Sequence, residues 1–366
     1  MQRSSIHRAT AALLLLGLGA LTACGSDGGG DADGGSDRDE VVLVTHESFL
    51  VSDAVWEAFT EETGYRVKVL RAGDAGVVVN QAVLSAGNPQ GDVLFGVDNT
   101  LLSRALEAGI FEPHEAAGLD QVPAELRLDD AEHRVTPVDT GDICVNYDRA
   151  YFAEHDIAPP RTLADLADPA YADLLVVQNA ATSSPGLGFL LATVAAFGEG
   201  GEGGEDGWAA YWAALRANGV EVVDGWEQAY NERFSGAGQG GDKPLVVSYA
   251  TSPPAGVVYG GDERPEQAPT GVATGTCFRQ VEFAGLLAGA ANPEGGRALL
   301  DFLLGLEFQE DMPLSMFVYP ARQDAELPEE FTRYAEPVDE VHELAPEEIA
   351  EHRDRWIDEW TDLVVR

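Results

Sequence analysis

The feature that most constrains the fold is a repeated switch between short apolar runs and amphipathic helical patterns, which begins at Val41. Runs of strand length alternate with segments whose apolar residues recur every three or four positions. Gly64 and Gly109 follow two of the helical segments, as expected of residues that end a helix. This alternation is typical of α/β proteins in which helices cover a parallel sheet, and it predicts a βαβαβα unit.

A second series of the same kind follows between residues 173 and 252. Two long extended segments, 137–148 and 271–283, flank it, and helical sequence completes the chain. We therefore expect an α/β fold of two lobes, each a mostly parallel sheet flanked by helices, with the extended segments crossing between the lobes as a hinge. The expected boundaries are 41–138 for the first part of lobe 1, 139–272 for lobe 2, and 273–366 for the return to lobe 1 and the C-terminal helices.

The amino terminus resembles an export signal. Arg3 and Arg8 precede the apolar run 11–20, which is too short to span a bilayer. The sequence LTACGS around Cys24 resembles a bacterial lipoprotein cleavage box, so we expect residues 1–23 to be a signal peptide and Cys24 to carry the lipid. The Gly- and Asp-rich segment 24–40 is then a lipidated flexible tether on the outer face of the cell membrane.

The balance of charge limits the classes of partner. The chain of 366 residues has 63 acidic and 22 basic side chains, which gives a formal net charge of −41. Such a surface repels phosphate backbones and acidic lipid head groups, so it argues against nucleic-acid binding and polybasic membrane docking. It favours a cationic ligand.

The cysteines and histidines give little indication of a metal or cofactor. Apart from Cys24, the chain has only Cys144 and Cys277, and we expect isolated buried thiols, with a disulfide in an oxidising exterior as the alternative. The chain has no CxxC pair, and its histidines are scattered without the spacing of metal ligands. We predict neither a metal site nor a cofactor.

Polar and aromatic side chains gather where the predicted strands end. In open α/β sheets ligands bind at the carboxyl ends of strands, so these positions form a candidate site. Carboxylates, hydroxyls, an amide and aromatic rings suit a flat, cationic ligand that forms hydrogen bonds. The candidate ligand-binding residues are Glu47, Asp98, Asn99, Asp139, Ser183, Trp226, Tyr230, Tyr249 and Phe317.

Each candidate also has a purely structural interpretation. Asp98 and Ser184 can serve as helix caps. Trp226, Tyr230 and Phe234 are spaced four residues apart and can form an ordinary core stripe of a helix. The functional interpretation depends on several such residues converging at strand ends.

Several motifs, in order, resemble the thiamine-binding solute receptors of bacterial ABC importers, a branch of the two-lobed extracellular binding proteins. The resemblance covers nearly all of residues 41–366. The motifs that carry it are VLFGVDNTLL, PVDTGDICVNYD, ATSSPGLGFLL, DGWEQAY, LVVSYATSP, VYP and LAPEEIAEHRDRWIDEW.

The resemblance implies a receptor without catalytic activity that binds thiamine, thiamine monophosphate or thiamine diphosphate in the cleft between the lobes. It also implies a type II binding-protein fold, a monomer, and delivery of the ligand to a permease with its ATPase. By the same resemblance, the binding residues are Glu47, where relatives usually have Asp, together with Asp98, Ser183, Trp226 and Tyr249.

Two positions depart from the family pattern. Phe317 stands where Trp commonly precedes VYP, and Ala255 stands where Tyr often follows the SerPro pair. Both changes alter the aromatic surface available for stacking and bear on the preference among free and phosphorylated thiamine. Tyr259 is a candidate to replace the missing ring.

Two other functions remain open at this stage. Thiamine-cleaving enzymes share this fold and use a Cys nucleophile activated by an acid, and Cys144 with Glu282 would be the candidates here. A receptor for ferric iron or a polyamine is the second alternative, although the adjacent tyrosines typical of iron receptors are absent from the sequence.

Overall fold

The structure is a computed structural model that describes residues 39–200, 206–238, 240–260 and 265–366. The signal peptide, the tether and Cys24 lie outside the described residues. The strands are β1 Glu40–Thr45, β2 Arg66–Arg71, β3 Val93–Asp98, β4 Phe111–Glu112, β5 Thr136–Asp148, β6 Leu175–Gln178, β7 Glu221–Val223, β8 Leu245–Tyr249, β9 Thr270–Leu287 and β10 Tyr319–Pro320.

Helices alternate with these strands in both parts of the chain. The α-helices are α1 Asp53–Thr63, α2 Ala75–Leu84, α3 Leu102–Glu107, α4 Arg149–Glu154, α5 Ser184–Phe197, α6 Trp208–Ala217, α7 Pro253–Val258, α8 Pro293–Leu303, α9 Leu306–Ser315, α10 Glu329–Tyr334 and α11 Pro346–Trp360. The short helical turns are η1 Leu119–Gln121, η2 Ala124–Leu126, η3 Asp165–Ala167, η4 Pro169–Tyr171, η5 Gln228–Arg233, η6 Ser235–Ala237 and η7 Thr361–Val365.

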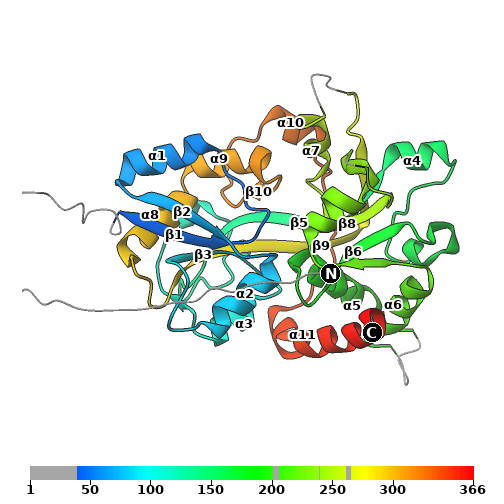
Figure 1. Cartoon of the computed structure of the whole chain (residues 1–366), viewed down its shortest axis with the longest axis horizontal. Coiled ribbons are helices and arrows are strands. Elements are labelled where there is room, and N and C mark those ends of the chain that lie inside the picture. Colours follow the sequence, from blue (N-terminus) through cyan, green and yellow to red (C-terminus); the bar gives the residue numbers. More distant parts are fainter. Residues whose placement is uncertain (1–38, 201–205, 239, 261–264) are drawn as a thin grey trace, which may run out of the picture. The chain divides into compact units, whose positions relative to one another are not determined.

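The strands form one continuous hydrogen-bonded path in the order β2-β1-β3-β9-β5-β8-β6-β7, with β4 added to β9 and β10 added to β5. At one end β1 pairs in parallel with β2 and β3, and at the other end β6 pairs in parallel with β7 and β8. The long strands β5 and β9 pair antiparallel with each other and run between these two parallel groups (Figure 1). This is the expected two-lobed α/β arrangement, and its crossing strands are the predicted segments.

The first series, from β1 to α3, follows the expected pattern closely. Helix α1 begins at Asp53 and ends at Gly64, whose φ of 79° is the left-handed conformation that glycine adopts without strain. Phe59 is fully buried in the core that the first series shares with α8 and α9. Helix α2 begins after Asp74, whose carboxylate accepts the N–H of Ala75. These ends place polar groups at the carboxyl edge of the sheet.

The second series, from β6 to β8, differs from expectation in one element. The segment 226–234 was expected to be an ordinary helix, and its central part instead forms the π-helical turn η5. Tyr230 and Phe234 are buried in a small core with Val176 and Val246, so the aromatic stripe does pack inward. Trp226, at the start of the stripe, stays partly exposed. The wider turn leaves this ring at the edge of the lobe.

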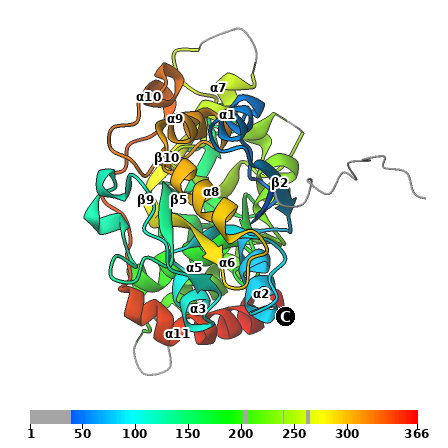
Figure 2. The same cartoon turned by 90° about the vertical axis from the view of Figure 1, so that its left-hand side faces the viewer.

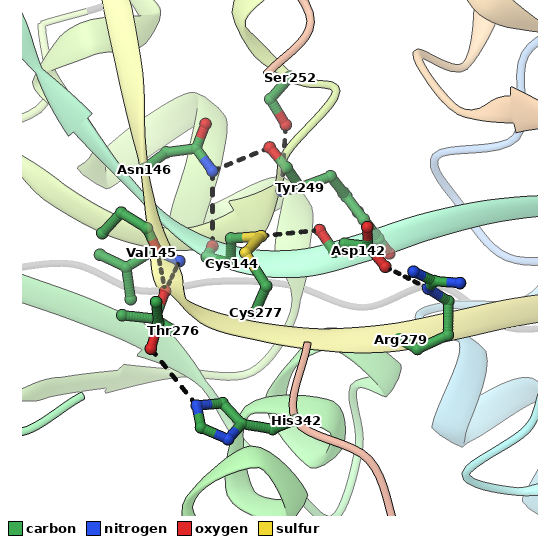
Figure 3. Close-up of a disulfide and its surroundings, with 12 residues drawn as sticks. Asp142, Cys144, Val145, Asn146, Tyr249, Ser252, Thr276, Cys277, Arg279 and His342 are labelled. Carbon is green, nitrogen blue, oxygen red and sulfur yellow. Dashed lines mark hydrogen bonds and ion pairs between the residues drawn. A yellow bond between two sulfur atoms is a disulfide. The ribbon is translucent and has the colours of Figure 1, made fainter. Parts of the chain in front are cut away.

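The expectation of isolated thiols was wrong, because Cys144 and Cys277 form a disulfide (Figure 3). The two residues are 133 positions apart in sequence, on β5 and β9. The register of these strands shifts between Ile143 and Val145, and the two Cα atoms lie 4.2 Å apart. The disulfide therefore joins the two crossing strands directly.

Helix α11 packs against both parts of the chain (Figure 2). Arg353 is buried and donates to the carbonyl of Thr100 and to the hydroxyl of Ser103, next to α3. On the other side, Arg355 and Trp356 both donate to the carboxylate of Glu199, just after α5. Among the described residues, no helix has the length and apolar character needed to cross a membrane.

Candidate functional site

Asp74, which the sequence did not single out, connects the two series. It is the N-cap of α2, and its carboxylate also accepts the backbone N–H of Trp226 at 2.9 Å and that of Ser184 at 3.3 Å. Burial raises its pKa, while these hydrogen bonds act in the opposite direction. The start of α2 approaches the second series so closely that a Cβ on Gly76 would lie 2.6 Å from the carbonyl oxygen of Thr182. The predicted site residues therefore lie where the two series touch.

Asp98 ends β3 and is fully buried. Its carboxylate accepts hydrogen bonds from the backbone N–H groups of Thr100 and Leu101, from the hydroxyls of Thr100 and Ser184, and from Nε2 of Gln280. Burial raises the pKa of this carboxyl, and the donors oppose that effect by stabilising the ionised form. Asp98 thus closes the turn before α3, whose N-cap position is Leu101, and also holds Ser184 of the second series.

Three acidic side chains form a row across adjacent strands, which we call the carboxyl row. Glu282 on β9 is the register partner of Asp98 on β3 and also of Asp139 on β5. The register shifts at Gly96 and at Val138 give Glu282 both partners. Directly opposed side chains on neighbouring strands lie about 5 Å apart at Cβ, and like charges there are destabilising.

The environment of the carboxyl row offers little positive charge. Burial, followed by the charges of Asp139 and Asp98, raises the pKa of Glu282 well above its usual range. Burial raises the pKa of Asp139 to about 7. His46 lies 3.5 Å from Glu282, but burial and the charge of Arg71 lower its pKa to about 4, so His46 is neutral at pH 7. The negative charge of the row therefore has little compensation from the side chains around it.

The aromatic candidates Trp226, Tyr230 and Tyr249 differ in their contacts and in their burial. Trp226 stacks on Tyr230 with ring centroids 4.8 Å apart, and its indole N–H donates to the hydroxyl of Ser248. Tyr230 is almost fully buried beneath it and supports the Trp226 ring. Burial and the nearby acids Glu282, Asp74, Asp98 and Asp139 raise the pKa of Tyr249.

The ring of Tyr249 depends on a glycine of the PVDTGD motif. A Cβ on Gly141 would lie 2.9 Å from Cδ1 of Tyr249, so a larger residue there would displace the ring. Tyr249 is the one aromatic candidate whose electrostatic environment includes all three members of the carboxyl row. It therefore supplies a polar aromatic group where the negative charge is concentrated.

Glu47 and Ser183 lie near Asp74. Glu47 is exposed, and partial burial followed by the charges of Asp74 and Glu227 raises its pKa. Ser183 is buried at the start of α5 as the residue before Ser184, whose N–H Asp74 accepts, and the hydroxyl of Ser183 has no hydrogen-bond partner among the described residues. The structure thus brings together Glu47, Asp98, Asp139, Ser183, Trp226, Tyr230 and Tyr249.

Two candidates lie elsewhere or have other partners. The side chain of Asn99 bonds the backbone of β9 at Arg279 and Val281, and it lines a cavity of about 240 Å³ with Leu126 and Glu343. Phe317 contacts Tyr259 edge to face, with centroids 5.7 Å apart. Tyr259 is largely exposed, so the pair presents aromatic surface beside α7, and the strand β10 that follows Phe317 pairs with Thr140 and Asp139 of β5.

The site contains residues that the sequence reasoning missed. Asp74, His46 and Gln280 were not among the candidates, and Glu282 was considered only as a partner for a catalytic cysteine. Asp74 follows β2, so the strand-end rule could have found it, whereas His46 lies at the end of β1 beside Glu47, where that rule did place a candidate. No local signal marks Gln280 or Glu282, because their place depends on the register of β9 with β3 and β5.

Comparison with known proteins agrees with the geometry. Residues 88–253 match the model of the family described as bacterial extracellular solute-binding protein. A solved periplasmic thiamin binding protein superposes with a TM-score of 0.76 at 27% identity, covering 89% of this chain and 96% of that one. The fold is that of a two-lobed type II binding protein.

Sequence relatives extend over the same region. The thiamine-binding periplasmic protein of Salmonella typhimurium is 28% identical over 331 residues, which are 89% of this chain and 94% of the relative. Iron uptake protein A1 of a Synechocystis strain is 23% identical over 85% of this chain and 84% of its own length. The resemblance to thiamine-binding receptors is confirmed, and these relatives are named for binding and uptake.

Proposed function

We propose that the chain is the extracytoplasmic receptor of an ABC importer, which captures thiamine or one of its phosphate esters between the lobes and delivers it to the permease and its ATPase. The observation that carries this proposal is the carboxyl row beside Tyr249, which has no Lys or Arg side chain bonded to it in the described residues, together with Trp226 held at Asp74. The names of the relatives supply the identity of the ligand.

Thiamine has the complementary chemistry. Its thiazolium ring is a cation, which the acidic side chains of the site attract. Both of its rings can stack on aromatic faces, and a cation gains additional energy there. The aminopyrimidine offers donors and acceptors to Ser183, Gln280 and Tyr249.

The alternative functions have weaker support. The sulfur of Cys144 is bonded to Cys277, so it is not available as a nucleophile, and a receptor without catalytic activity is the better proposal. Iron or a polyamine would also be attracted by acidic residues, and one relative is named for iron uptake. Within the described residues, no group of three or more His, Cys, Asp or Glu side chains is arranged to hold a metal ion.

Calorimetry tests the ligand assignment. Residues 41–366 should bind thiamine reversibly, and mass spectrometry of the recovered ligand should show unchanged thiamine. Ferric citrate and spermidine serve as competing ligands under the same conditions. Heat for either of these with none for thiamine would overturn the assignment, and free pyrimidine or thiazole products would instead indicate an enzyme.

We further propose that residues 1–23 are removed on export and that Cys24 anchors a monomeric receptor to the outer face of the cell membrane. The motif LTACGS and the acidic, Gly-rich segment after it support this. The lobe boundaries at 138 and 272 belong to the same proposal, with β5 and β9 as the hinge.

Labelling of cells tests the anchor. A fatty-acid analogue should label the full chain and should not label Cys24→Ser, because the thiol of Cys24 is the expected site of lipid attachment. Cys144 and Cys277 are joined to each other and provide no free thiol for the label. Equal labelling of the two proteins would contradict the anchor.

A further inference from the structure

The carboxyl row places three buried acidic side chains next to one another, so their negative charge must be compensated in the ligand-free protein. Asp98, Glu282 and Asp139 are side by side on three adjacent strands, and each is at least nine-tenths buried. Asp98 has five donors for its carboxylate, so its ionised form is well stabilised. Glu282 and Asp139 have no comparable set of donors.

Asp139 shows this lack of hydrogen-bond donors most directly. Its Oδ2 atom is buried and receives no N–H or hydroxyl hydrogen bond. Glu282 is its register partner on β9, and two buried carboxylates placed opposite each other repel unless one of them holds a proton. Glu282 lies between two acids and is the member that gains most from holding this proton.

The groups that face the carboxyl row from other elements do not supply it with a positive charge that would make a proton unnecessary. His46 after β1 is neutral, Asp74 before α2 is itself acidic, and Tyr249 at the end of β8 is uncharged. Arg71 on β2 contributes through its effect on His46, and its guanidinium is bonded to the carbonyl of Phe49. Gln280 donates to Asp98 and carries no charge.

We infer that the Glu282–Asp139 pair holds an exchangeable proton in the ligand-free receptor and that a cationic ligand replaces this proton, so that each binding event releases a proton. The inference rests on the proposed function and adds Glu282, with Asp139, to the residues that determine specificity. On binding, the O–H bond of the shared carboxyl breaks, the proton passes to a buffer base, and the carboxylate remains beside the cation. A neutral analogue cannot drive this exchange.

The sign of the pH dependence follows from linkage. Burial raises the pKa of Glu282 well above its usual range and that of Asp139 to about 7, and a bound cation would lower both. Protons therefore compete with the ligand as pH falls through this value. The affinity for thiamine should rise with pH between about pH 6 and pH 8, by up to about tenfold per pH unit.

Calorimetry of the unmodified receptor in two buffers of different ionisation enthalpy measures the proton directly. We expect the binding heat at pH 7 to differ between buffers by an amount equal to about one released proton per thiamine. Glu282→Gln keeps the shape of the protonated side chain and should lose most of this release and of the pH dependence. Asp142→Asn is the matched control on β5, because Asp142 is paired with Arg279, and it should keep both.

The outcomes separate the two claims. Equal heats in both buffers, with thiamine bound, would overturn the proton exchange and leave the proposed function in place. No heat for thiamine at all would overturn the ligand assignment and this inference with it. If Glu282→Gln fails to fold, the two-buffer measurement on the unmodified receptor still decides the question.

Discussion

Replacing Cys144 and Cys277 together by Ser should lower the free energy of unfolding by about 4 kcal/mol, because the bond closes a long loop in the unfolded chain. The sequence separation is 133 residues, and the entropy cost of closing a loop grows slowly with its length. The sulfurs are buried in an apolar cluster with Ala250 and Val272, so the two Ser hydroxyls add a desolvation cost to the loss of the bond. Urea unfolding of residues 41–366 measures the difference.

Reduction of the parent protein provides the control for this change. Residues 41–366 contain no other cysteine, so a reducing agent acts on this bond alone. The reduced parent and the double Ser variant should both unfold at a urea concentration well below that of the oxidised parent, with the Ser variant the lower of the two because of its buried hydroxyls. If all three unfold together, the disulfide does not contribute to stability in solution.

Replacing Trp226 by Ala should weaken thiamine binding by at least tenfold. A cation on a desolvated indole ring gains roughly 2 kcal/mol, which corresponds to about thirtyfold in affinity. Trp226 is suited to this role because it is partly exposed, is stacked on Tyr230, and is held by Ser248. Calorimetric titration of the folded variant measures the loss.

Trp212 is the matched control. Its ring is fully buried and its N–H donates to the hydroxyl of Thr193. Trp212→Ala should cost about 3 to 5 kcal/mol of stability by leaving a cavity, while the folded fraction keeps its affinity. The two variants should therefore show opposite defects. A folded Trp226→Ala protein that binds thiamine as well as the parent would assign Trp226 to the core stripe alone.

Much of the fold could be predicted because the information is local. The period of the apolar residues marked both series, and Gly64 marked the end of α1. The strand-end rule likewise found Asp98 and Tyr249, since both follow from where a strand stops. These predictions needed no knowledge of which strands are neighbours.

What the sequence could not supply depends on long-range register. Glu282 acquires its role only because β9 lies between β3 and β5, with a register shift on each side. The disulfide depends on the same pairing. The strand-end rule selected Asn99 because it is adjacent to Asp98 in sequence. Its side chain bonds the backbone of β9, and this contact also depends on the long-range pairing of strands.

Helix α11 makes a further connection between the lobes, separate from the crossing strands and from the contacts of Asp74 and Asp98. Arg353 holds it to the carbonyl of Thr100, two residues beyond Asp98, and Trp356 holds it to Glu199 in the second series. Any separation of the two series must break one of these attachments or carry the helix with one side. Under the proposed function, the lobes must separate before a captured ligand can leave, so the attachments of α11 slow ligand dissociation. Dissociation rates account for most differences in affinity between related complexes.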